Sequence, residues 1–257
     1  MNLGELLEEL REGILHDTSD QVGTPEYPDQ LWSDKRLVRY INEAQRRFAR
    51  RSLILRDGLT PEVTQVVPTA GVNMYPLHPS VIAVISARCY GDRADLARAG
   101  HSSFDTYREP DTYFFDPSSL SSLPPGKVVA YDTDEFMNEN DTGSLSVVNL
   151  RLYPPPDTAN LQRIDLRVIR MPIRRLCEDR LDDIPEIPED NHLEMLDWAA
   201  YLALRIVDRD QGDSERAQEF KASFEEHVVA ARDVAQRKMF TPMQWGFGRN
   251  GFSYERD

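Results

Sequence analysis

Apolar residues recur at steps of three and four over residues 189–239, and this spacing predicts two consecutive helices. Gly212-Asp213-Ser214 is the expected break between them, because glycine ends helices and Asp or Ser caps the next one. The apolar positions are Leu193, Leu196, Ala200, Ala203 and Val207 in the first helix, and Phe220, Phe224, Val228, Ala231, Ala235 and Met239 in the second. The pattern predicts an antiparallel helical hairpin whose apolar stripes need a partner surface.

Two further helices are predicted near the start of the chain. The second of them follows Ser33, a favoured capping residue, and Trp32 is placed to pack back on its apolar face. The apolar positions are Leu3, Leu6, Leu7, Leu10 and Ile14 in the first helix, and Leu37, Ile41, Ala44 and Phe48 in the second. These stripes are the expected partners of the helical hairpin.

Between the two helix pairs, the hydrophobic period changes to one typical of strands. Residues 59–178 predict a mostly antiparallel β unit of five or more short strands. Strands are expected at 63–67, 74–77, 81–90, 127–131, 145–152 and 163–170, with a short helix near 92–100. In the last strand, Ile164, Leu166 and Val168 alternate with other residues, which indicates one buried face.

Together, these elements predict an α+β fold in which an antiparallel four-helix bundle is interrupted by an inserted, mostly antiparallel β domain. The predicted divisions are 1–58 for helices one and two, 59–185 for the β domain, 186–239 for helices three and four, and 240–257 for an extended C-terminal arm. The arm has no helical or strand period. Its sequence fits either a disordered terminus or a segment that docks aromatic side chains on another subunit. Those side chains are Phe240, Trp245, Phe247, Phe252 and Tyr254.

The balance of charge narrows the function classes. The chain of 257 residues has a formal net charge of -14 and a pI near 4.8. Phosphate contacts need Lys and Arg, so an acidic chain is a poor free-standing binder of nucleic acid or of anionic membranes. No run approaches the 18 apolar residues of a membrane span, and no membrane partner is expected.

One helix face departs from this acidic balance. The second predicted helix carries a cluster of basic residues opposite its apolar stripe, including Arg39, Arg46, Arg47, Arg50 and Arg51. One interpretation is a solvated face paired with Glu and Asp of neighbouring helices. The other is a patch for an acidic partner, either a neighbouring subunit or DNA, because the planar guanidinium binds carboxylate or phosphate in two places.

Candidate chemistry is sparse. Residues 246–251 match Gly-x-Gly-x-x-Gly, but a dinucleotide site needs a strand before it and a helix after it, and neither is predicted here. Residues 132–135 offer carboxylates to a hard cation, although an acidic loop is the favoured interpretation. Cys89 and Cys177 are interpreted as buried thiols. No nucleophile, base and oxyanion site assembles, so we expect no enzyme, no metal and no cofactor.

Several short motifs follow one another in a fairly specific order. They are Leu-Trp-Ser-Asp (31–34), Leu-Val-Arg-Tyr-Ile-Asn-Glu-Ala-Gln-Arg (37–46), Val-Pro-Thr-Ala-Gly-Val-Asn-Met-Tyr-Pro-Leu (67–77), Leu-Tyr-Pro-Pro-Pro-Asp (152–157), Val-Ile-Arg-Met-Pro (168–172), Glu-Ile-Pro-Glu-Asp-Asn-His (186–192) and Asp-Trp-Ala-Ala-Tyr-Leu-Ala-Leu (197–204). Over nearly the whole chain, this order resembles the head-to-tail adaptor proteins of tailed bacteriophages, including the tail-tubular-protein-A-like adaptors of short-tailed phages.

The resemblance implies a non-enzymatic structural virion protein at the head–tail junction, or neck, assembled in the host cytoplasm. Family members usually form a ring of twelve copies beneath the portal, join capsid to tail and line the DNA channel. The implied partners are the portal protein, a tail or nozzle protein and other copies of the chain, while double-stranded DNA passes without sequence-specific binding. The resemblance also implies that residues 240–257 reach the portal through their aromatic side chains.

A ring needs two complementary faces on each subunit, and an acidic lumen would not hold back the passing duplex. The candidate pair of faces is the basic helix face and the acidic stretch 178–190. The inter-subunit candidates are Arg39, Arg46, Arg47, Arg50 and Arg51 on one side, and Asp182, Asp183 and Glu186 on the other.

Two other functions stay open at the level of sequence. One is a non-enzymatic helical interaction module that recruits a partner through its aromatic C-terminal tail. The other is a hydrolase with an unrecognised site in the β domain. A large ring, detected by mass measurement, would separate the adaptor from the first of these.

Overall fold

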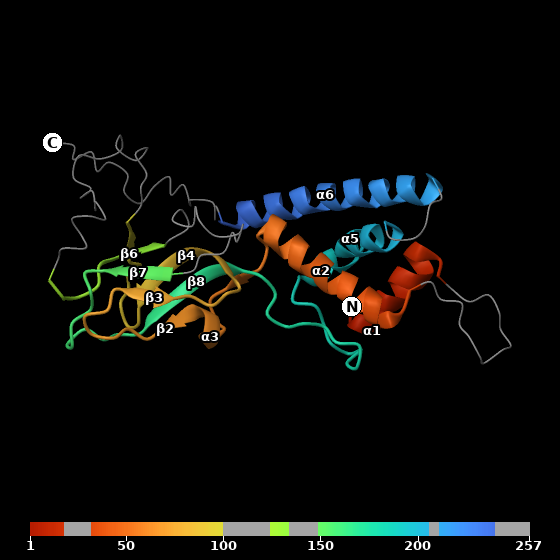
Figure 1. Cartoon of the computed structure of the whole chain (residues 1–257). Coiled ribbons are helices and arrows are strands. Elements are labelled where there is room, and N and C mark those ends of the chain that lie inside the picture. The colour runs from red at the N-terminus through yellow and green to blue at the C-terminus, as the bar shows by residue number, and fades with distance from the viewer. Residues whose placement is uncertain (18–31, 100–123, 134–148, 206–210, 240–257) are drawn as a thin grey trace, which may run out of the picture.

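The computed structural model describes residues 1–17, 32–99, 124–133, 149–205 and 211–239. Helices gather at one end of the molecule and two β-sheets at the other (Figure 1). The α+β class predicted from the hydrophobic pattern is confirmed.

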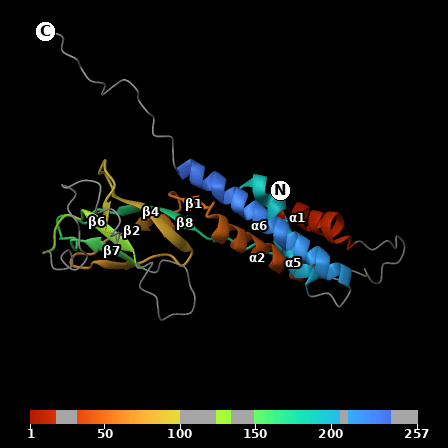
Figure 2. The same cartoon turned by 90° about the horizontal axis from the view of Figure 1, so that it is seen from above.

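The helical part is built from the two ends of the chain. It contains α1 (Leu3–Glu8), a π-helix η1 (Glu9–Leu15), α2 (Asp34–Ser52), a short 3-10 helix η3 (Glu189–Asn191), α5 (His192–Leu204) and α6 (Gln211–Met239). At the start of α1, Asn2 accepts from the Glu5 amide and Glu5 reciprocates, which is a capping box. Seen from above, α6 lies across α2 and α5, and it packs against both (Figure 2).

One apolar core joins these helices. Phe224 of α6 lies between Phe48 of α2 and Trp198 of α5, with ring centroids 5.9 Å and 5.1 Å away. Buried aromatic side chains in such tilted contacts contribute more than their apolar area alone. Most of the predicted stripe positions are buried in this core: Leu3, Leu6, Leu7, Leu10, Leu37, Ile41, Ala44, Phe48, Leu196, Ala200, Ala203, Phe224, Val228 and Ala231.

Two details of the predicted hairpin are wrong. Leu193, assigned to the apolar face, is 53% exposed, while its neighbour His192 is buried and bonds to the carbonyl of Ile187. Gly212-Asp213-Ser214 lies in the first turn of α6 rather than between the helices. The first turn of a helix tolerates these residues, because its amide groups have no intrahelical partners and Asp or Ser can satisfy them.

The predicted antiparallel four-helix bundle is also wrong. In the part of the chain that the structure covers there are five α-helices of very unequal length and two sheets. The first apolar stripe forms only the six residues of α1 and the seven of η1, whereas α6 has 29 residues, or roughly 43 Å at 1.5 Å per residue. Such a short first element covers only one end of the longer helices. Leu176 and Ile187, from the segment between sheet and α5, fill part of the same core.

The β part contains two four-stranded sheets. In the first, β8 (Ile164–Arg170) pairs antiparallel with β1 (Arg56–Asp57), β2 (Gln65–Val66) and β4 (Val81–Cys89). In the second, the order is β3 (Met74–Pro76), β7 (Asn149–Tyr153), β6 (Ala130–Thr133) and β5 (Ala97–Arg98). All described pairs are antiparallel except β5 with β6. A second apolar core contains residues from both sheets, such as Val84, Leu152 and Leu166.

The strand predictions are partly confirmed. Ile164, Leu166 and Val168 of β8 are buried as the alternation predicted. The strand expected at 63–67 is wrong over its first residues, which belong to helix α3 (Pro61–Thr64), because proline at the first helical position favours that turn. The short helix expected near 92–100 does not occur over 92–99, where β5 pairs with β6 instead.

A nearly buried ionic network joins the first sheet to the segment that leads to α5. Arg170, the last residue of β8, places Nε 2.6 Å from Asp57 Oδ2 and Nη1 2.5 Å from Glu186 Oε2. The three side chains are 13%, 6% and 14% exposed. Glu186 Oε1 also accepts the backbone amides of Ile173 and Arg174. The network therefore fixes the path of the chain as it leaves the sheet.

Replacing Arg170 with Met should lower the free energy of unfolding by about 3–5 kcal/mol, because two carboxylates would stay enclosed without their cation. Arg167→Met is the matched control: Arg167 is exposed on the same strand, and its change should cost no more than about 0.5 kcal/mol. Urea unfolding followed by circular dichroism measures both. Equal costs for the two variants would contradict the role given to the network.

The same network predicts a dependence of stability on pH. Burial acts to raise the pKa of Asp57, but hydrogen bonds from Thr60, Leu59 and Arg170 outweigh it and hold the pKa far below its usual value. Because the folded pKa lies below the unfolded one, this stabilisation is complete above the unfolded value near ~3.9 and is lost as pH falls toward the folded value. Asp57→Asn should therefore destabilise the protein at pH 7 and flatten the decline in stability between about pH 5 and pH 2. Thermal melts across that range test it, and a parallel decline in both proteins would be the contrary result.

Candidate functional site

The basic face of α2 borders a groove between that helix and the segment 171–175, which leaves β8. The groove consists of two adjoining hollows of about 280 and 440 Å³, which share Glu43 and Arg46. We call it the arginine groove. The arginines that line it are Arg39, Arg46, Arg47, Arg50, Arg51, Arg174 and Arg175.

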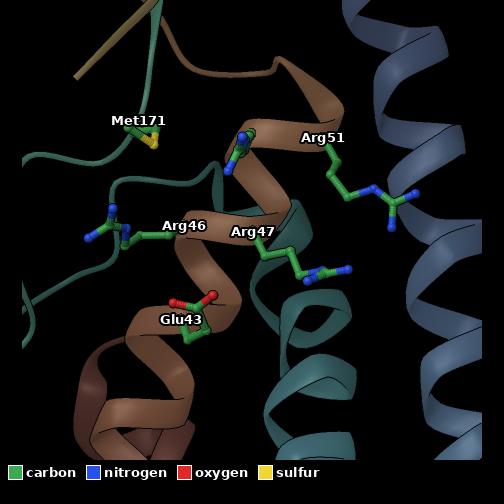
Figure 3. A pocket seen from close by; sticks show the side chains of 6 residues that line it. Glu43, Arg46, Arg47, Arg51 and Met171 are labelled. Atoms are coloured by element: carbon green, nitrogen blue, oxygen red, sulfur yellow. The ribbon is translucent and has the colours of Figure 1, made fainter. Parts of the chain in front are cut away.

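Helical spacing explains how α2 contributes to this groove. Arg39, Glu43, Arg46 and Arg50 follow at steps of four, three and four, so they share one face of the helix, away from the buried stripe. Figure 3 shows Arg46 extending toward the segment that carries Met171, while Arg47 and Arg51 extend to the other side, toward α5 and α6. Two sets of arginines on one helix thus face different surroundings.

The far wall of the groove is held by hydrogen bonds to its backbone. Asn42 of α2 both donates to the carbonyl of Leu176 and accepts its amide, each at 2.9 Å. The Met171 amide donates to the carbonyl of Ser80 at 2.8 Å, and the Glu186 carboxylate accepts the amides of Ile173 and Arg174. Arg174 and Arg175 are therefore exposed side chains on a fixed backbone.

Sequence reasoning missed Arg174 and Arg175. They follow the last strand and precede a strongly acidic stretch, and that contrast in charge was the available signal. Only the fold places them across the groove from α2.

The five arginines predicted on α2 divide into two groups. Arg47 lies with its guanidinium carbon 3.8 Å from the centre of the Trp198 ring, and Arg51 forms an ion pair with Glu225 of α6. Arg39, Arg46 and Arg50 are exposed, and no carboxylate of the described residues lies within 4.0 Å of their guanidinium groups. The first group serves the helical core, whereas the second faces outward.

The predicted acidic residues are similarly divided. Glu186 belongs to the Arg170 network, and Asp183 lies 3.3 Å from Arg180. Asp182 is exposed and, within the described ranges, has no cationic group within 4.0 Å. The acidic stretch is held against α1, because the amides of Leu3 and Gly4 donate to Asp183 and Leu181 at 2.8 and 2.9 Å. A single chain therefore does not pair its acidic stretch with its arginine groove.

The predicted portal-binding side chains, Phe240, Trp245, Phe247, Phe252 and Tyr254, lie outside the described residues. Helix α6 ends just before them, at Met239. Its last turns are tied to the sheet end of the molecule, because Arg56 donates to the carbonyl of Ala235.

A second polar cluster joins α5 to α6. Ser223 donates to Asp197 at 2.7 Å, His227 Nε2 lies 3.2 Å from the same hydroxyl, and His227 Nδ1 lies 3.6 Å from Glu194. Burial raises the pKa of Asp197, partly offset by the hydrogen bond from Ser223 and by His227. These residue types occur in hydrolase triads, but here the serine proton points to a carboxylate rather than to the histidine. The cluster is a polar link between two helices.

Among the described residues, no group of three His, Cys, Asp or Glu side chains is arranged to hold a metal, and no helix combines the length and apolar character needed to cross a bilayer. Cys89 is a buried free thiol, and burial raises its pKa, whereas Cys177 is a partly exposed free thiol.

Comparison with known proteins complements this geometry. The model of one protein family, described as SU10 adaptor protein, matches residues 1–245, which include every described helix and strand. A search of curated proteins finds no match. The match confirms the resemblance to phage head-to-tail adaptors that the order of motifs indicated. The chain belongs to the SU10 adaptor protein family.

Proposed function

We propose that this protein is a structural, non-enzymatic phage adaptor that forms a ring beneath the portal and joins the capsid to the tail. The observation that carries this proposal is the family match over residues 1–245, because it covers the helical part and both sheets together. The partners in this proposal are the portal protein, a tail or nozzle protein and further copies of the same chain. Its place is the neck of the virion.

The charge of the chain supports passage of DNA through such a ring. A net charge of -14 disfavours lasting contact with phosphate, so a lumen lined by this chain would let a duplex move. The arginine groove does not contradict this, because its cations lie together at one place between α2 and the segment 171–175. A local cluster of arginines is better suited to one defined contact than to contact with DNA that moves through the ring.

The proposed portal contact is the segment 240–257 with its aromatic side chains. Aromatic anchors contribute much of the binding energy at protein interfaces, and five of them occur in these last residues. The cores of the described fold are formed by residues that precede Met239. Binding and folding should therefore be separable by truncation.

Deletion of residues 241–257 should leave the circular dichroism spectrum unchanged and shift the melting temperature by no more than about 2 °C. The truncated chain should nevertheless fail to co-sediment with the portal protein of the same virus. A matched control keeps the full length and carries Gln244→Ala and Asn250→Ala, which spare the aromatic anchors and should preserve binding. Normal co-sedimentation of the truncated chain would refute the role of this segment.

The adaptor function itself is tested by mass measurement and electron microscopy of the full chain, with and without that portal protein. A ring seated on the portal, and the protein located in virion necks by antibody labelling, are the expected results. A chain that stays monomeric with the portal and is absent from virions would instead favour the helical interaction module.

A further inference from the structure

We propose that the arginine groove of one chain receives the acidic turn of a second copy. The acidic turn is defined here as residues 178–182, between the groove wall and α5. The inference rests on the proposed function, since a closed ring needs a contact between two different surfaces of each subunit.

The groove has cations that its own chain leaves unpaired. Arg39, Arg46, Arg174 and Arg175 are all exposed, and within the described ranges none has a carboxylate within 4.0 Å. Like charges held close together on a fixed backbone repel one another, and an anion that enters between them relieves that repulsion. Arginine forks bind carboxylates in two places, so an acidic peptide fits this wall.

The groove also has an apolar component. Pro172, Ile173 and Leu202 belong to its lining, and Ile173 is 39% exposed. A site for an anion alone would not need an exposed isoleucine. The lining therefore favours an occupant that combines carboxylates with an aliphatic side chain.

The acidic turn has that combination. Glu178, Asp179 and Asp182 are exposed, and no cationic group of the described chain lies within 4.0 Å of them. Leu181, between them, is 51% exposed. A large aliphatic residue flanked by unpaired acids on an exposed turn is typical of a segment that docks on another surface.

The turn is preorganised for such a contact. The amide of Arg180 donates to Cys177 at 3.0 Å, and that of Asp183 donates to Arg180 at 3.1 Å, which makes two successive turns. Asp183 pairs with Arg180 at 3.3 Å, and none of the outer acids makes an ion pair that close with this arginine. Little conformational entropy remains to be lost on binding, which favours association.

The turn cannot fill the groove of its own chain without rearrangement. Hydrogen bonds from the Leu3 and Gly4 amides hold the turn beside α1. The two hydrogen bonds between the Asn42 side chain and the Leu176 backbone hold Leu176 at the middle of α2. In Figure 1, the same segment runs along α2 and reaches its turn beside α1. The two surfaces point to a contact between copies, in which the turn of one chain meets the groove of the next.

Two residues of the original acidic set are excluded from this contact. Glu186 is used by Arg170 and by two backbone amides, and Asp183 is paired with Arg180. On the basic side, Arg47 and Arg51 are excluded because they pack on Trp198 and pair with Glu225. Reversing their charges would damage the fold and would not test the interface.

The test uses full-length chains with charges reversed on one surface at a time. The groove variant is Arg174→Glu with Arg175→Glu, and the turn variant is Asp179→Arg with Asp182→Arg. The control is Arg232→Glu with Arg237→Glu, two exposed arginines of α6 outside the groove. Self-association is measured by sedimentation velocity and native mass spectrometry at low salt, and circular dichroism verifies the fold of each variant.

We expect each single-surface variant to lose at least tenfold in self-association, while the control matches the wild-type chain. An equimolar mixture of the groove and turn variants should associate into assemblies larger than a dimer, because the two intact surfaces are complementary and so are the two reversed ones. A chain that carries all four reversals should associate again. Wild-type association should weaken with added salt, because the exposed ion pairs are screened.

The contact would be overturned by a wild-type chain that stays monomeric at ~1 mM and low salt, by a control that fails like the groove variant, or by no recovery in the fourfold variant. Retention of a short DNA duplex that only the groove variant loses, with association unchanged, would also overturn it and assign the groove to nucleic acid. Failure here is distinguishable from failure of the adaptor function, since the presence of the protein in virion necks is tested independently.

Discussion

The guanidinium of Arg170 lies between two carboxylates that come from distant parts of the chain, Asp57 of β1 and Glu186, which precedes α5. Arg170 is the last residue of β8, and the segment that follows it, 171–175, forms the wall of the arginine groove. Glu186 pairs with Arg170 and also accepts the backbone amides of Ile173 and Arg174 in that wall. Its charge and its hydrogen bonds therefore stabilise the same short segment. The position of the groove relative to the sheets therefore depends on Arg170, which is nearly buried and is not among the residues that line the groove.

The arginines of α2 form two sets with different contacts. Arg47 and Arg51 turn toward α5 and α6, where one lies over an indole ring and the other pairs with a carboxylate. Arg39, Arg46 and Arg50 face the groove. The sequence allowed two interpretations of this basic helix. Pairing with neighbouring helices applies to Arg47 and Arg51, whereas a patch for an acidic partner applies to Arg39, Arg46 and Arg50.

Local pattern predicted most of the elements but not their assembly. The stripes of α2 and α6 are visible in the sequence because each helix has one buried face, and β8 because its side chains alternate. The prediction that Leu193 is buried is wrong because α5 is buried around most of its surface. The spacing of its apolar residues therefore does not show which side of the helix is exposed. The four-helix bundle failed because the first apolar stripe forms only the short α1 and η1, and because Leu176 and Ile187, which lie outside the helices, fill part of the core. Arg174 and Arg175 needed the fold, since only tertiary contacts place them opposite α2.

Helix α6 is tied at both ends. Near its start, Arg216 donates to the carbonyl of Ile14 at 3.1 Å, and near its end the carbonyl of Ala235 accepts from Arg56. The segment after Met239 therefore follows a helix that is anchored about one turn before its end. In an assembly of many copies, such anchored helices would be repeated at fixed spacings, and each binding event would raise the effective concentration of the next. Individually weak anchors could then give a durable attachment through avidity.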